Sequence, residues 1–270
     1  MYSQQLISSP DNTHCKLVRA LSKKKRVRTR HGLYVAEGLR LVAQALEAGI
    51  VPAFMFASES FGADPRGREL LAGLSPETQT IHATDQVMRS LGETVHSQGV
   101  IALLPLPAYD APIVADGDPV LILDAIRDPG NMGTILRTAA AAGVEAVLAM
   151  PGCVDPYAPK VVRAGMGAQA IVPILSPDDW SAVTSMLSRH TCVLADGAAD
   201  TPYWQQDWRR RLALIIGGEA NGAGTEARAL ATQSVCLPMA QGMESVNAAI
   251  ATGVLLFEIR RQRSLVGPSR

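Results

Sequence analysis

From Pro119 onward, short apolar runs alternate with longer segments in which apolar residues recur at helical spacing. The short runs predict strands at residues 119–123, 145–150, 171–174, 191–195, 211–216 and 234–237. The longer segments predict helices at residues 132–142, 158–167, 178–189, 225–232 and 246–262. This alternation is typical of a parallel sheet covered by helices on both faces. Because ligands of such sheets bind at the carboxyl ends of the strands, the loops after Leu123, Ile216 and Leu237 form the candidate site.

The N-terminal part of the chain predicts a smaller α/β layer. Its expected strands are residues 32–37, 51–57 and 96–104, and its expected helical segments are residues 38–48, 66–74 and 87–91. Prolines and acidic residues then mark a linker. The sequence therefore predicts one domain over residues 1–105, a linker over 106–117 and a second domain over 118–270.

Length and composition agree with two cytoplasmic α/β domains. The chain has 270 residues, of which 47% are apolar and only 4% aromatic, so aliphatic side chains and glycine carry the packing. No run is long and apolar enough to span a membrane, and no signal-peptide pattern begins the sequence. The four cysteines are far apart and form no C-x-x-C pair, which argues against a zinc site and gives no sign of a disulfide framework.

Basic residues are concentrated at the N-terminus, although the formal net charge of the chain is 0. Residues 1–31 contain eight Lys or Arg and one acid, and the candidate contacts for a polyanion are Lys16, Arg19, Lys23, Lys24, Lys25 and Arg26. A solvated helix face or a loose arm explains the same charges equally well.

The first candidate loop contains D-P-G-N-M-G-T-I-L-R-T-A, from Asp128 to Ala139. Asp128 and the residues after it predict a turn, and Asn131 is in a position to cap the helix that follows. Arg137 stands among small and apolar neighbours. A lone arginine on a helix is usually a surface charge. Because Arg137 has only small and apolar neighbours in the sequence, we interpret it instead as a residue that binds a specific partner.

The second and third candidate loops also combine glycine with polar residues. I-I-G-G-E-A-N-G contains Gly217, Gly218 and Glu219, but its glycine spacing differs from the dinucleotide-binding fingerprint. In S-V-C-L-P-M-A-Q-G-M-E-S-V-N-A-A, Ser245 and Asn247 stand where a helix would begin. Each loop alone fits an ordinary βα unit, with Glu219 as a surface acid. Three such loops on one edge of a sheet make a ligand site the better explanation.

These three stretches, in this order, strongly resemble the three motifs of the SpoU/TrmH-type RNA 2′-O-ribose methyltransferases of the SPOUT superfamily. V-D-P-Y-A-P-K-V-V-R-A-G-M-G-A is similar to the segment between the first two motifs. The basic opening and Y-V-A-E-G-L-R resemble the family's N-terminal L30e-like RNA-binding domain. The resemblance covers nearly the whole chain.

The resemblance implies a C-terminal trefoil knot, bound S-adenosylmethionine, an RNA substrate and a homodimer. The positions it assigns to the cofactor are Gly217, Gly218, Leu237, Met239, Val246 and Asn247. Those it assigns to catalysis are Asn131, Arg137, Glu219, Ser245 and Asn247. It implies no metal. A separate N-terminal domain favours 23S ribosomal RNA over transfer RNA, by analogy.

The residue types fit methyl transfer to a ribose hydroxyl. The motifs contain no histidine, and arginine is a poor base because its pKa exceeds about 12. We therefore expect Arg137 to hold an RNA phosphate and favour the developing alkoxide, while Ser245 and Asn247 orient the ribose. Two alternatives remain, a non-catalytic RNA-binding relative and a nicotinamide-dependent oxidoreductase. The second lacks its glycine fingerprint.

Overall fold

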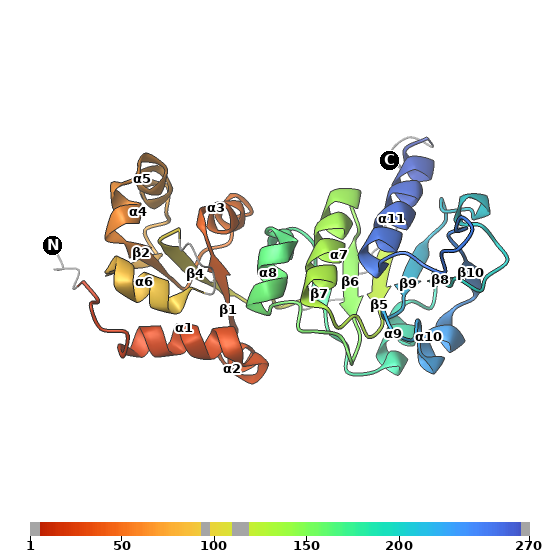
Figure 1. Cartoon of the computed structure of the whole chain (residues 1–270), viewed down its shortest axis with the longest axis horizontal. Coiled ribbons are helices and arrows are strands. Elements are labelled where there is room, and N and C mark those ends of the chain that lie inside the picture. The colour runs from red at the N-terminus through yellow and green to blue at the C-terminus, as the bar shows by residue number, and fades with distance from the viewer. Residues whose placement is uncertain (1–5, 93–97, 110–118, 266–270) are drawn as a thin grey trace. The chain divides into compact units, whose positions relative to one another are not determined.

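The computed structural model describes residues 6–92, 98–109 and 119–265 (Figure 1). The chain forms two compact units, which are described separately. Unit 1 comprises Met1–Ala108 and Tyr157–Ala170, and unit 2 comprises Tyr109–Pro156 and Ile171–Arg270. Most of the expected linker lies outside the described residues, and the domain limits predicted from the sequence stay a prediction.

Unit 1 is built on a four-stranded mixed sheet with strand order β1-β4-β2-β3. The strands are β1 (Leu33–Glu37), β2 (Phe54–Ser58), β3 (Gln79–Ala83) and β4 (Val100–Pro105). β4 pairs antiparallel with β1 and β2, and β2 pairs parallel with β3. The sequence missed β3 because it is a short edge strand whose first residue is exposed, so its apolar pattern is weak.

Helices α1 (Thr13–Lys23) and α2 (Lys25–His31) contain the basic N-terminal residues. Cys15, Val18 and Leu21 of α1 are buried in the core of unit 1, so this segment is a packed amphipathic helix and not a loose arm. The side chain of Arg28 in α2 is buried and donates to the carbonyl oxygens of Leu21 and Ser22. Arg28 therefore provides hydrogen-bond donors for carbonyl groups in the last turn of α1, which lack partners within the helix.

The other helices of unit 1 frame its sheet. They are α3 (Leu39–Glu47), α4 (Glu59–Ala63), α5 (Pro65–Ala72), α6 (Asp85–Leu91) and α8 (Pro159–Gly165). α8 comes late in the chain but packs against β1. It ends where Met166 adopts a left-handed conformation with φ of 49°, which stops the helix two residues before the predicted limit.

Unit 2 contains the predicted parallel sheet. Its six strands have the order β10-β8-β9-β5-β6-β7, and every pair is parallel. The strands are β5 (Val120–Leu123), β6 (Ala146–Ala149), β7 (Ile174–Leu175), β8 (Thr191–Ala195), β9 (Leu212–Ile216) and β10 (Gln233–Val235). The expected strand at 171–174 was placed too early, because most of that run belongs to the loop before β7.

Helices cover this sheet on both faces. α9 (Trp180–Met186) and α10 (Thr225–Leu230) bury Val183 and Ala227 against Val120, Ile122 and Ile215. Leu121 and Leu214, whose side chains alternate to the other face, are also fully buried. α7 (Pro129–Ala142) and α11 (Ala248–Ser264) pack side by side (Figure 1). In the part of the chain that the structure describes, no helix has the length and apolar character needed to cross a membrane.

Candidate functional site

The three candidate loops leave the same edge of the unit 2 sheet, as predicted. β9 lies between β5 and β8, and β10 pairs with the outer side of β8. Because all these strands are parallel, the loops after Leu123, Ile216 and Val235 emerge together at their carboxyl ends.

The first loop ends in a tightly capped helix. Asp128, and not Asn131, caps α7: its Oδ1 accepts from the backbone N–H of Asn131 at 2.8 Å. Pro129 occupies the first helical position, where its missing N–H costs nothing. The predicted cap at Asn131 was therefore wrong, because the helix starts earlier. Asn131 lies inside the first turn, and its side chain is free to turn toward the neighbouring loop.

Glu219 joins the second loop to the first. Its carboxylate accepts from the Asn131 side-chain amide at 3.0 Å and from the backbone N–H groups of Arg127 at 3.3 Å and Asp128 at 3.4 Å. Burial raises the pKa of this carboxyl, but these hydrogen bonds together outweigh burial, so the pKa of Glu219 lies below its ordinary value. Glu219 is thus an ionised anchor whose oxygens already accept N–H groups.

Asn247 extends the same chain of hydrogen bonds to the third loop. Its Nδ2 donates to Asn131 Oδ1 at 2.8 Å, while its Oδ1 accepts from the backbone N–H of Ala249 at 2.8 Å and caps α11. The groups at the two ends of this series of hydrogen bonds fix both amide orientations. The Glu219 carboxylate can only accept, and the backbone N–H groups at the N-terminus of α11 can only donate. Glu219, Asn131 and Asn247 therefore form one ordered cluster.

The glycines of the second loop allow close backbone approach. A Cβ at Gly217 would lie 2.2 Å from the backbone nitrogen of Ala223, and one at Gly218 would lie 2.5 Å from the carbonyl oxygen of Ala125. Gly218 and Gly222 also exchange two backbone hydrogen bonds of 3.0 Å. This small hairpin carries Glu219 at its tip.

A cavity of about 320 Å³ opens beside the third loop. Its wall includes four of the predicted positions, Leu237, Met239, Ser245 and Val246. It also includes Asp196 and Gly197, which follow β8. The size and the mixture of apolar and polar groups are those of a small-molecule site. Gly217 and Gly218 do not line this cavity; they belong to the hairpin of the second loop.

Arg137 belongs to neither the cluster nor the cavity wall. It lies on the exposed face of α7 and makes no hydrogen bond or ion pair within the described part of the chain. Ser245 is also exposed. Both side chains are therefore available to a ligand from solution.

Sequence reasoning missed two aspartates at the same edge. Asp124 is buried, and its Oδ2 accepts from the backbone N–H of Gly224 at 2.7 Å, which ties the first loop to the second. Asp196 follows β8 and lines the cavity. The rule that ligands bind beyond strand carboxyl ends applies to β8 as well, and it would have found Asp196.

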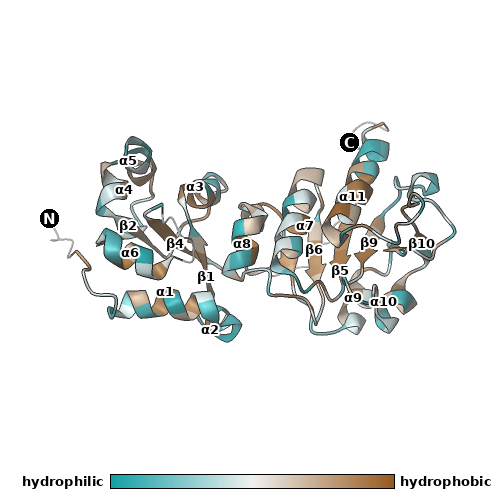
Figure 2. Ribbon diagram, in the orientation of Figure 1, coloured by the Kyte–Doolittle hydropathy of each residue, from teal (hydrophilic) through white to brown (hydrophobic). Residues whose placement is uncertain are grey.

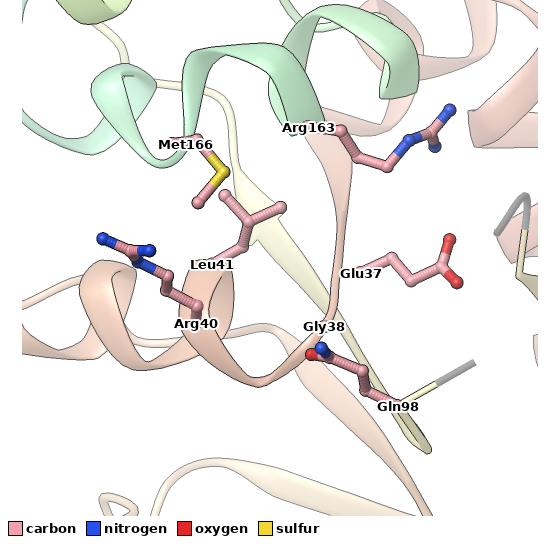
Figure 3. Close-up of a pocket in the computed structure, with 7 residues that line it drawn as sticks. All are labelled: Glu37, Gly38, Arg40, Leu41, Gln98, Arg163 and Met166. Atoms are coloured by element: carbon pink, nitrogen blue, oxygen red, sulfur yellow. The ribbon is translucent and has the colours of Figure 1, made fainter. Parts of the chain in front are cut away.

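Unit 1 has a pocket of its own, of about 260 Å³. In Figure 3, Leu41 and Met166 face each other with Arg40 beside them, and the Gln98 amide lies against Gly38. Gln98 accepts from the backbone N–H of Leu39 at 2.8 Å. Glu37 and Arg163 complete the wall, so the pocket combines charged, amide and apolar groups.

The predicted polyanion contacts lie in unit 1. Lys16, Arg19 and Lys23 belong to α1, Lys24 stands between the helices, and Lys25 and Arg26 belong to α2. All are exposed except Arg19, which is partly buried and donates to Ser90 Oγ at 3.4 Å. The ribbon of α2 is coloured largely hydrophilic in Figure 2.

A parallel sheet with a cavity and an ordered polar cluster at its carboxyl edge defines an α/β protein that binds a small ligand there. The profile of the SpoU rRNA Methylase family matches residues 118–257, and that of the MRM3-like substrate binding domain matches residues 12–102. The chain belongs to the SpoU rRNA methylase family, as its motifs predicted.

Individual relatives match almost the whole chain. Mouse mitochondrial rRNA methyltransferase 3 is 31% identical over 94% of this chain and 73% of its own length. The 23S rRNA (guanosine(2553)-2′-O)-methyltransferase RlmP of Bacillus subtilis is 30% identical over 94% of this chain and 98% of its own. The crystal structure of the SpoU methyltransferase AviRb from Streptomyces viridochromogenes, in complex with the cofactor AdoMet, matches with a TM-score of 0.86. It is 27% identical and covers 94% of this chain and 98% of that one.

Proposed function

We propose that this protein transfers a methyl group from S-adenosylmethionine to a ribose 2′-hydroxyl of ribosomal RNA. The observation that carries the proposal is the cluster of Glu219, Asn131 and Asn247, which joins all three motif loops beside a ligand-sized cavity. Membership of a methylase family and the relatives named above support the reaction and the class of RNA.

The cavity suits S-adenosylmethionine. Leu237, Met239 and Val246 provide apolar walls for an adenosine group, and the carboxylates of Asp196 and Glu244 favour a cationic ligand. When bound, this cofactor supplies an electrophilic methyl group on a sulfonium.

The catalytic roles follow from the hydrogen bonds that each side chain already makes within the protein. Glu219 is ionised and its oxygens accept N–H groups, so it orients Asn131 and does not collect a proton. Asn247 is held by Asn131 and by its helix cap, and together with Ser245 it orients the ribose. Arg137 holds the neighbouring phosphate and stabilises negative charge as the hydroxyl oxygen releases its proton to solvent water.

Unit 1 is proposed to hold the RNA. The exposed cations of α1 and α2 attract phosphates without reading sequence. The pocket around Arg40 and Gln98 offers a second contact for a nucleotide. The L30e-like character of this unit and the trefoil knot of unit 2 stay predictions.

We further propose a homodimer through α11. Ile250, Val254 and Phe257 are 59%, 38% and 51% exposed and fall on one stripe of the helix. The opposite face, including Leu255 and Ile259, is buried in unit 2. Figure 2 shows this helix as hydrophobic along much of its length. An exposed apolar stripe of this kind is typical of a protein–protein interface.

The proposed reaction is tested by incubating the protein with labelled S-adenosylmethionine and RNA that lacks the modification, followed by nuclease digestion and nucleoside analysis. We expect a 2′-O-methylated nucleoside in 23S ribosomal RNA. A methylated base would overturn the mechanism, and exclusive labelling of transfer RNA would overturn the substrate. Cofactor binding without transfer to any RNA would favour a non-catalytic RNA-binding relative.

A further inference from the structure

One arginine side chain joins the loops that follow two neighbouring strands of unit 2. Arg228 of α10 donates through Nη1 to Asp196 Oδ2, in the loop after β8. Its Nε donates to the carbonyl oxygen of Ala223 at 3.2 Å, in the loop after β9. The backbone N–H of Arg228 donates to Gly224 at 3.0 Å, so both the main chain and the side chain of this residue are held at the junction.

Asp196, at one end of this bridge, forms part of the cavity wall. Its Oδ1 accepts from the backbone N–H of Ala198 at 3.1 Å, and its own backbone N–H donates to Val235 at 2.9 Å. The hydrogen bond from Arg228 lowers the pKa of the Asp196 carboxyl, although burial opposes the shift. The wall is thus fixed by an ionised carboxylate that Arg228 holds in place.

Ala223, at the other end, belongs to the loop that carries Glu219. The paired backbone groups of Gly218 and Gly222 make the tip of that loop a rigid hairpin. Asp124 holds the next residue of the loop, because its carboxylate accepts from the backbone N–H of Gly224. Arg228 therefore lies on a continuous path from the cavity wall to the cluster of Glu219 and Asn131.

The energetics favour a positioning role over a stabilising one. The Arg228 side chain is 49% exposed and that of Asp196 is 19% exposed, and ion pairs near the surface contribute little to folding stability. Holding two loops in their ligand-binding arrangement before the ligand arrives lowers the ordering cost of binding. The consequence of the bridge should therefore appear in ligand affinity.

We propose that Arg228 is a positioning residue that preorganises the cofactor cavity by fixing Asp196 and the Glu219 loop together. This rests on the proposed function, since it takes S-adenosylmethionine as the ligand of the cavity. Arg228 is not among the residues that line the cavity; it acts through Asp196 and the backbone of Ala223.

The test compares full-length Arg228→Ala and Arg228→Lys with the control Arg210→Ala. Arg210 makes a more exposed surface ion pair of 3.4 Å with Asp207, and neither residue lines the cavity. Binding of S-adenosylmethionine is measured by calorimetry, KM and kcat by methyl transfer, and stability by thermal unfolding without ligand.

For Arg228→Ala we expect Kd and KM for S-adenosylmethionine to rise about tenfold, because both loops must then be ordered on binding. We expect kcat and the unfolding temperature to match those of Arg210→Ala. Arg228→Lys should recover part of the affinity, because its single ammonium nitrogen can pair with Asp196 but no second nitrogen lies at the position from which Nε donates to Ala223.

Unchanged affinity in Arg228→Ala would overturn the proposal, as would an affinity loss that simply follows a lower unfolding temperature. Failure of the unaltered protein to bind S-adenosylmethionine would instead refute the proposed function. The two failures are thus distinguished in a single experiment.

Discussion

The side-chain amide of Asn247 donates to the side-chain oxygen of Asn131 across 2.8 Å, although the two residues are 116 positions apart in the chain. Asn131 also donates to Glu219, and the side-chain oxygen of Asn247 also accepts from a backbone N–H in the first turn of α11. The N-termini of α7 and α11 are therefore locked together.

Asn131→Asp should abolish methyl transfer and make stability depend on pH. The new carboxylate would face Glu219 at the present hydrogen-bond distance of 3.0 Å. Two ionised carboxylates repel at pH 8, whereas one of them can hold a proton near pH 5. The unfolding temperature of the variant, relative to that of the unaltered protein, should accordingly be lower at pH 8 than at pH 5. An equal difference at both pH values would contradict the contact between residue 131 and Glu219.

Glu219→Gln should lower stability at neutral pH and cease to do so in acid. The folded-state pKa of Glu219 is depressed, so the ionised carboxylate stabilises the fold above the ordinary glutamate pKa of about 4.3. This contribution is lost as the pH falls through the lower folded-state pKa. Unfolding curves from pH 8 to pH 3 should therefore converge at the acid end. Glu69→Gln, at an exposed position of α5, serves as the control for replacing a glutamate elsewhere in the chain.

Arg137→Ala should reduce kcat by about a hundredfold or more while leaving cofactor binding unchanged, because the guanidinium acts on charge that develops during transfer. Arg137→Lys should retain part of the activity through its positive charge. The matched control is Arg189→Ala, an exposed arginine beyond α9. Near-normal turnover in Arg137→Ala would remove Arg137 from the catalytic residues.

Val254→Glu should shift the protein to a monomer. The change places a charge in the middle of the exposed stripe of Ile250, Val254 and Phe257, and desolvating an unpaired carboxylate opposes association. Sedimentation velocity over a range of concentrations measures this directly. Ile171→Glu, at a residue that is 54% exposed, is the control. The α11 interface is wrong if both variants sediment alike.

Gln262→Ala should lower the free energy of unfolding by about 1–3 kcal/mol, because it leaves buried backbone groups without partners. Gln262 Oε1 accepts from the backbone N–H of Trp208 at 3.1 Å, and its Nε2 donates to the carbonyl oxygen of Gln206 at 3.2 Å. The control Arg66→Ala removes only an exposed ion pair with Asp64. Urea unfolding should separate the two variants, and equal stability would contradict this role for Gln262.

The sequence determined the parallel sheet, its strand–helix alternation and the membership of each motif loop in the candidate site. These features are local: apolar runs of strand length, helical spacing, and glycine or aspartate at the turns. The sequence did not predict the edge strand β3, because its apolar pattern is weak. It also did not identify Asp128 as the cap of α7, because several polar residues near that position could cap the helix.

Only the tertiary structure decided which polar groups meet. Asn131, Glu219 and Asn247 could each be a surface residue until the strand order β10-β8-β9-β5 places their loops on one edge. Arg228 is indistinguishable from any helical arginine until Asp196 and Ala223 are found at its two ends. Hydrogen bonds of this kind depend on atoms brought within about 3 Å by packing far along the chain. The periodicity of apolar residues does not predict those distances.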